Sequence, residues 1–280
     1  MNASRTADGD GPMADLGADF PARLASAVVL AAVALAGAWF GGWVAAVVVA
    51  AAAVVVHLEW IGLTERSPWP AAIFTGALVV AIALVSAGVP VAGFAVVGIA
   101  ILAAAVGTGD PWRPLGLAYA ALLGLGLIVL RLTPELGFAA IVVVFAVVWA
   151  TDTGAFVAGR LIGGPRLWPK VSPNKTWAGG IAGLALGVAA GALAAAAFGV
   201  PIGAPLLAVA ALLSLAAQAG DLFESRIKRL FGAKDSGRLI PGHGGLMDRV
   251  DGLTFAAGLA ALVGWLNAGP AGVAAGLLQW

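Results

Sequence analysis

The sequence predicts an all-α, polytopic integral membrane protein with about nine transmembrane helices and active-site loops on the cytoplasmic side. Hydrophobic residues make up 61% of the 280 residues and charged residues only 10%, against about 25% charged in an ordinary soluble domain. The mean hydropathy is +1.02. This composition excludes a soluble globular protein, a disordered chain and a nucleic-acid-binding protein with a basic face. Because there is no cysteine, a disulfide scaffold is excluded as well.

Six stretches without Asp, Glu, Lys or Arg define the expected helices: 24–58, 67–109, 114–130, 136–151, 176–220 and 252–280. A bilayer-spanning helix needs about 20 apolar residues, so the first, second and fifth stretches are too long for one span. Each has a turn signal near its middle, at Gly41-Gly42, Gly88-Val89-Pro90 and Gly199-Val200-Pro201. These three stretches are therefore expected to form helical hairpins.

The remaining stretches are expected to supply one span each, which brings the count to nine. The fourth is expected to continue past Asp152 to about Ala158, and the last is interrupted at Gly269-Pro270. The runs are continuously apolar, without the alternating polarity of β-barrel strands. Three regions follow: a disordered cytoplasmic tail over 1–22, N-terminal transmembrane helices over 23–135, and a C-terminal catalytic region over 136–280.

The basic residues predict the orientation. With nine spans, all 15 Lys and Arg residues except Arg131 fall on the side of the N-terminus. Positive charge is retained on the cytoplasmic side, so the N-terminus is expected in the cytoplasm and the C-terminus outside the cell (inner) membrane. The acidic, Gly-rich and Pro-rich first 20 residues lack the positive start of a cleaved signal peptide.

The segment 221–251 concentrates the polar chemistry. A carboxylate at membrane depth, as expected for Asp221, is costly unless it pairs or binds a cation. Carboxylates mixed with basic residues and glycine turns suit a Mg²⁺-bound nucleoside triphosphate. There is no Walker A motif, and a merely solvated loop is the alternative. A second basic segment holds Arg166, Lys170, Ser172 and Lys175.

The run from Ser225 to Asp251, SRIKRLFGAKDSGRLIPGHGGLMDRVD, resembles the signature of the phosphatidate cytidylyltransferases, also called CDP-diglyceride synthases. The motifs GDLFES (220–225), DTGAF (152–156) and SPNKT (172–176) also resemble family motifs, so the resemblance covers about 150–255. It implies that CTP reacts with phosphatidate to give CDP-diacylglycerol and pyrophosphate. Mg²⁺ is the implied cofactor, and a second cation is left open.

The resemblance also implies roles for individual residues, each with an alternative. Metal ligands are expected at Asp221 and Asp248, then at Asp251 and Asp152. The first two carboxylates would otherwise pair with Arg226 or Arg249, and Asp152 would be a hydrogen-bonded structural residue. Catalytic roles around the CTP phosphates are expected for Lys234, Asp235, His243 and Arg249.

Substrate binding is expected at Lys170, Ser172, Lys175, Ser225, Lys228, Arg229 and Arg238. Ordinary positive-inside charge is the alternative for the basic residues among them. His57 and Glu59, near the end of the second span, are interpreted as interfacial and structural.

The expected partners are CTP, phosphatidic acid and membrane lipids, with no nucleic acid and with a homodimer left open. Two other functions compete. One is a CTP-dependent enzyme that acts on another membrane lipid, such as a polyprenol kinase or an archaeal-type lipid cytidylyltransferase. The other is a transporter, which would need polar residues scattered through several spans.

Overall fold

The computed structural model describes residues 20–64, 71–237, 239 and 244–280. The helices are α2 (Phe20–Phe40), α3 (Gly42–Thr64), α4 (Ala71–Ser86), α5 (Pro90–Thr108), α6 (Trp112–Arg131), α7 (Gly137–Leu161), α8 (Trp177–Ala197), α9 (Ala204–Leu230), α10 (Met247–Ala268) and α11 (Val273–Leu278). Residues 1–19 of the predicted tail lie outside the described residues. Helix α2 begins at Phe20, slightly before residue 23, where the first transmembrane helices are expected to begin.

The prediction of a polytopic helical membrane protein is confirmed. Within the described residues, seven helices are long and apolar enough to cross a membrane, namely α3 and α5 to α10. Helices α2 and α4 are apolar but shorter by the same measure. The exact count of nine spans therefore stays a prediction.

The three expected hairpins are present, and each turns at the predicted break. Gly41, Gly88 and Gly199 have φ angles of 62°, 83° and 72°, which glycine adopts at no steric cost. Helix α5 then begins at Pro90, whose fixed φ suits a first helical position. The last stretch also breaks as expected, because α10 ends at Ala268 before the short helix α11.

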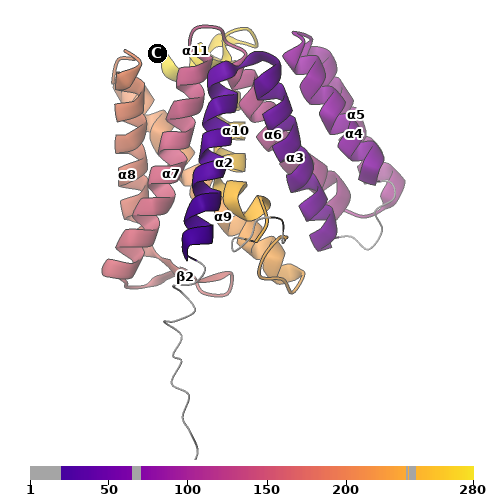
Figure 1. Ribbon diagram of the computed structural model, residues 1–280. Helices are drawn as coiled ribbons and strands as arrows, with labels where there is room; N and C mark the ends of the chain where they lie inside the picture. Colours follow the sequence, from indigo (N-terminus) through magenta and orange to yellow (C-terminus); the bar gives the residue numbers. More distant parts are fainter. Residues whose placement is uncertain (1–19, 65–70, 238, 240–243) are drawn as a thin grey trace, which may run out of the picture.

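Glycines allow the closest helix contacts. Helix α8 packs along α7 at one edge of the bundle, opposite α4 and α5 (Figure 1). A Cβ added at Gly183 of α8 would lie 2.7 Å from the Thr151 carbonyl oxygen of α7, and one at Gly179 would lie 2.6 Å from that of Ala155. Small residues at helix interfaces permit this approach in membranes, so the glycines hold the α7 backbone against α8.

The N-terminal end of α2 and the C-terminal end of α9 share one end of the bundle, and the C-terminus lies at the other (Figure 1). At that other end, Arg131 donates from Nε to the Ala38 carbonyl (2.5 Å) and from Nη2 to that of Trp39 (3.2 Å). These carbonyls belong to the last turn of α2, so no later turn of the helix can donate hydrogen bonds to them. The one basic residue predicted on the far side therefore caps a helix.

One element was not predicted. The loop after α7 forms an antiparallel hairpin of β1 (Arg166–Trp168) and β2 (Ser172–Thr176). It lies at the same end of the bundle as the C-terminal end of α9 (Figure 1). The all-α bundle thus carries a two-stranded hairpin, which places SPNKT on a strand.

Candidate active site

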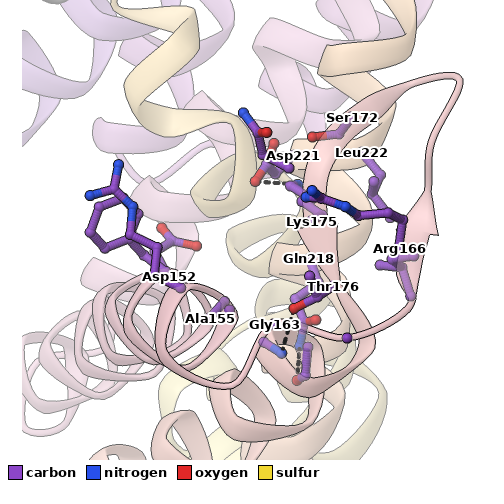
Figure 2. A pocket seen from close by; sticks show the side chains of 18 residues that line it. Asp152, Ala155, Gly163, Arg166, Ser172, Lys175, Thr176, Gln218, Asp221 and Leu222 are labelled. Carbon is purple, nitrogen blue, oxygen red and sulfur yellow. Dashed lines mark hydrogen bonds and ion pairs between the residues drawn. The ribbon is translucent and has the colours of Figure 1, made fainter.

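A cavity of about 760 Å³ opens between the end of α7, the β hairpin, the start of α8 and the middle of α9 (Figure 2). Its volume is within the range of small-molecule sites. Five charged side chains line it, two acidic and three basic: Asp152, Asp221, Arg160, Arg166 and Lys175. Mixed charge of this kind suits a phosphate ligand that binds together with a cation.

Local structure fixes the side chains of this cavity. Asp152 is on α7, which is held against α8 by the glycine contacts. Lys175 is on β2 and directly precedes Thr176, whose Oγ1 accepts the Gly179 N–H (3.1 Å) and caps α8. The strand therefore ends at a fixed helix start, and Lys175 points toward α9 (Figure 2).

Lys175 forms an ion pair with Asp221 across the cavity (Figure 2). Ser225 Oγ, one turn along α9, lies 3.4 Å from Asp221 Oδ1, and Lys175 also interacts electrostatically with Asp152. Arg226, the alternative partner of Asp221, instead lies over the Trp168 ring at 5.7 Å. The two polar segments recognised in the sequence thus meet at Asp221.

A second group of charges, the buried ion triad, follows two turns further along α9. Lys228 Nζ lies 2.6 Å from Glu224 Oε2 and 2.6 Å from Asp248 Oδ1. The side chains of Glu224 and Asp248 are only 1% and 5% exposed, and that of Lys228 is 13% exposed. One ammonium is therefore shared by two buried carboxylic groups, so that removing it would leave both without their cation.

Asp248, the second expected metal ligand, also organises the loop before α10. Its Oδ2 accepts the Ser236 N–H (2.9 Å), the Ser236 hydroxyl (3.0 Å) and the Gly245 N–H (2.9 Å). Asp248 is thus paired with Lys228, and Arg249 is exposed on α10.

Close packing of α9 on α10 brings Asp251 into the same acidic region. A Cβ on Gly220 would lie 2.5 Å from the Asp251 carbonyl oxygen. Asp251 interacts electrostatically with Asp221, Glu224 and Asp152. In the part of the chain that the structure describes, no three carboxylates or imidazoles gather closely enough to hold a metal by themselves. Mg²⁺ usually needs only one or two carboxylates beside phosphate oxygens, so this donor set fits a cation that binds with a nucleotide.

The other predicted residues lie around these two groups. Ser172 lines the cavity, whereas Lys170 is exposed in the hairpin turn. Arg229 donates to the Ala233 carbonyl (3.1 Å) at the end of α9. Lys234 and Asp235 are exposed on the loop. Arg238 and His243 lie outside the described residues.

Three contributors were missed or given no chemistry. Glu224 is fully buried, and its spacing of four residues from Lys228 was the available signal. Arg160 lines the cavity and stacks over Phe156 at 4.3 Å. Glu59 contacts the backbone of Leu246 and Met247, a structural role whose location no local pattern indicates.

The chain is similar to one protein family and to known proteins of that kind. A family model described as "Cytidylyltransferase family" matches residues 21–266. The chain is 42% identical over 258 residues to a phosphatidate cytidylyltransferase of Brucella suis biovar 1 (strain 1330), and the match covers 89% of this chain and 94% of that protein. A protein of the same name from Staphylococcus saprophyticus is 45% identical over 136 residues, covering 48% of this chain and 52% of that protein.

Proposed function

The chain belongs to the cytidylyltransferase family, and from that premise we propose that it is a phosphatidate cytidylyltransferase of phospholipid biosynthesis. It converts CTP and phosphatidate into CDP-diacylglycerol and pyrophosphate. The observation that carries this proposal is the mixed-charge cavity at the end of apolar helices, where Asp221 and Lys175 meet. Such a site can take a charged nucleotide from water and a charged lipid headgroup from the bilayer.

In this reaction a phosphate oxygen of phosphatidate attacks the α-phosphorus of CTP. A new phosphorus–oxygen bond forms, and the bond from the α-phosphorus to the bridging oxygen breaks, so that pyrophosphate leaves. Phosphoryl chemistry of this kind depends mainly on positioning and on neutralising charge. Because the attacking phosphate is already ionised, no strong general base is required.

The lipid is proposed to enter from the side of Phe156. This side chain lines the cavity and is 59% exposed, as expected for a surface in contact with acyl chains. Arg160 beside it, with Arg166 and Lys175, would hold the phosphate of phosphatidate. Lys234 and Asp235 of the loop and Arg249 of α10, with His243 and Arg238, are proposed to bind the CTP phosphates.

Mg²⁺ is the proposed cofactor, with Asp221 and Asp248 as its protein ligands and Asp251 and Asp152 as further carboxylates. Bound Mg²⁺ would neutralise the triphosphate and assist departure of pyrophosphate. Asp221 ranks first because it lines the cavity, whereas Asp248 is only 5% exposed and accepts hydrogen bonds from Lys228, Ser236 and Gly245. A second cation is compatible with the excess of carboxylates.

The site is proposed to face the cytoplasm, where CTP is available, with the C-terminus on the outer side of the cell membrane. The charge asymmetry supports this orientation. Association into a homodimer stays a prediction.

The proposal is tested with purified protein, labelled CTP, phosphatidate and Mg²⁺. A labelled lipid and an equal amount of pyrophosphate are expected, and both should disappear when the divalent cation is chelated. Polyprenol and archaeal-type lipids are offered as alternative acceptors in parallel reactions. No lipid product under any divalent cation, or a product only with another acceptor, would overturn the assignment. Solute flux into proteoliposomes without CTP turnover would instead support the transporter alternative.

A further inference from the structure

Glu59 lies on α3, in the half of the chain that carries none of the polar motifs, yet its carboxylate binds the backbone where α10 begins. Its Oε1 accepts the Leu246 N–H (2.8 Å) and its Oε2 accepts the Met247 N–H (2.7 Å). The first N–H groups of a helix have no acceptor within the helix, and negative charge at this end is stabilised by the helix dipole. Glu59 is therefore the acceptor that α10 lacks.

The same carboxylate reaches the beginning of the loop that precedes α10. We call the described residues 231–237 and 244–246 the signature loop. Ser236 Oγ lies 3.3 Å from Glu59 Oε2 and 3.0 Å from Asp248 Oδ2. Ser236 and the residues just before α10 are thus both tied to a pair of carboxylates, one from α3 and one from α10.

The position of Glu59 is itself fixed by its neighbour Trp60. The Trp60 side chain is fully buried, donates from Nε1 to the Trp112 carbonyl (2.9 Å) and stacks on Phe223 of α9 at 6.2 Å. The end of α3 is therefore attached to both α6 and α9. A side chain that is held in place by packing and hydrogen bonds around it can position the residues of a site without contacting the ligand.

Two glycines of the signature loop leave room for this carboxylate. A Cβ on Gly237 would lie 2.9 Å from Glu59 Oε1, and a Cβ on Gly245 would lie 2.6 Å from Glu59 Oε2. At Gly237 the nearest atoms all belong to Glu59. The glycines and Glu59 thus form one packed unit, although 178 residues separate Glu59 from Gly237 in the numbering.

We propose that Glu59 is a positioning residue for cytidylyl transfer, which fixes the signature loop and through it Lys234, Asp235 and Asp248. Glu59 acts through backbone amides and Ser236 and contacts no substrate. The inference rests on the proposed function, because it assigns the loop to CTP. It adds a contribution from the N-terminal helices to a site otherwise built by the C-terminal half.

The first test compares Glu59→Gln and Glu59→Ala with Glu135→Gln, a matched change at an exposed glutamate between α6 and α7. The turnover number should fall about tenfold or more in Glu59→Ala and less in Glu59→Gln, which keeps one acceptor oxygen. The KM for CTP should rise, while the KM for phosphatidate stays within about twofold. Loss of folded protein alone would lower the amount of active enzyme and change neither KM. Glu135→Gln should behave as wild type.

The second test uses the contact between Gly237 and Glu59. Gly237→Ala should displace the carboxylate and reproduce the rise in KM for CTP. In the Glu59→Ala background the same Cβ meets no carboxylate, so Gly237→Ala should add little further loss. Additive losses in the double variant would contradict the proposal.

Amide hydrogen exchange of peptides that cover 244–250 reports on the start of α10 without turnover, so it distinguishes a failure of this inference from a failure of the proposed function. Exchange should accelerate in Glu59→Ala and remain as in wild type in Glu135→Gln. A wild-type protein without cytidylyl transfer would remove the proposed function. An active wild type whose Glu59 variants keep their kinetic constants and exchange rates would remove this inference alone.

Discussion

Single residues show why the few charges of this chain lie where they do. The buried ion triad places Glu224 and Asp248 on the one ammonium of Lys228 at the end of a membrane helix. A buried pair adds little net stability over an apolar one, but the loss of one partner leaves an uncompensated charge. The stability of the protein should therefore tolerate the removal of one carboxylate of the triad better than the removal of the Lys228 ammonium.

Lys228→Met is expected to destabilise the protein by about 3–5 kcal/mol, because both carboxylates lose their cation. The thermal unfolding midpoint of the purified protein in detergent measures the effect. Lys170→Met, at an exposed position in the hairpin turn, is the control and should leave the midpoint unchanged. Adding Glu224→Gln to Lys228→Met should restore part of the loss. Equal midpoints for the two lysine variants would contradict a structural role for the triad.

The two first-ranked aspartates should differ in what they control. Asp221→Asn should lower turnover about 100-fold or more, as expected when charge stabilisation at the reacting phosphate is lost, with little change in the unfolding midpoint. Asp248→Asn should lower both turnover and the midpoint, because Asp248 also holds Lys228, Ser236 and Gly245. Paired measurements of rate and midpoint check this. Near wild-type turnover in Asp221→Asn would remove Asp221 from the proposed metal site.

At the scale of elements, the contact of α7 with α8 decides whether the cavity exists. Asp152 is on α7, and the hairpin that carries Lys175 connects α7 to α8. The carbonyls of Thr151 and Ala155 rest on glycines of α8 with no room for a Cβ. A shift of either helix would change the distance between the cavity carboxylates.

Gly183→Ala should push the two helices apart and cost about 1–3 kcal/mol, the usual range for overpacking. Turnover should fall as well, since Asp152 moves with α7. Gly98→Ala is the matched control, because a Cβ at Gly98 of α5 meets nothing within 4 Å. Unfolding midpoints and turnover of the two variants provide the comparison. If Gly183→Ala matches Gly98→Ala in both the unfolding midpoint and turnover, α7 and α8 are not close packed at Gly183.

At the scale of the whole molecule, the chain alternates between two ends, one with the candidate site and one with the C-terminus (Figure 1). The cap that Arg131 provides on α2 accounts for its place at the second end. The positive-inside rule predicts that the other basic residues of the sequence lie at the first end.

Reporter fusions should therefore place the two termini on opposite sides of the membrane. A fluorescent protein fused to the N-terminus should fluoresce in the cytoplasm, and alkaline phosphatase fused to the C-terminus should be active outside. A fluorescent C-terminal fusion would show that the number of spans is even, so that one of the shorter helices α2 and α4 does not cross.

The sequence alone determined the helical membrane class, the hairpin breaks and the segments that carry the chemistry, because these depend on local properties. Long apolar runs must satisfy their backbone hydrogen bonds within a helix in lipid, and glycine and proline interrupt them wherever they stand. The resemblance and the charge pattern indicated Asp221 and SPNKT as parts of the site, and the structure brings both to one cavity.

Only the tertiary structure decided which charges meet. Lys175 rather than Arg226 pairs with Asp221, Glu224 completes the buried ion triad, and Glu59 caps α10. The β hairpin was equally unpredicted, because its pairing lies in a short polar loop without a strand pattern. These contacts join segments up to 188 residues apart. Spacing along a helix reveals neighbours three or four residues away, whereas partners on different helices depend on how closely glycines such as Gly183 and Gly220 allow those helices to pack.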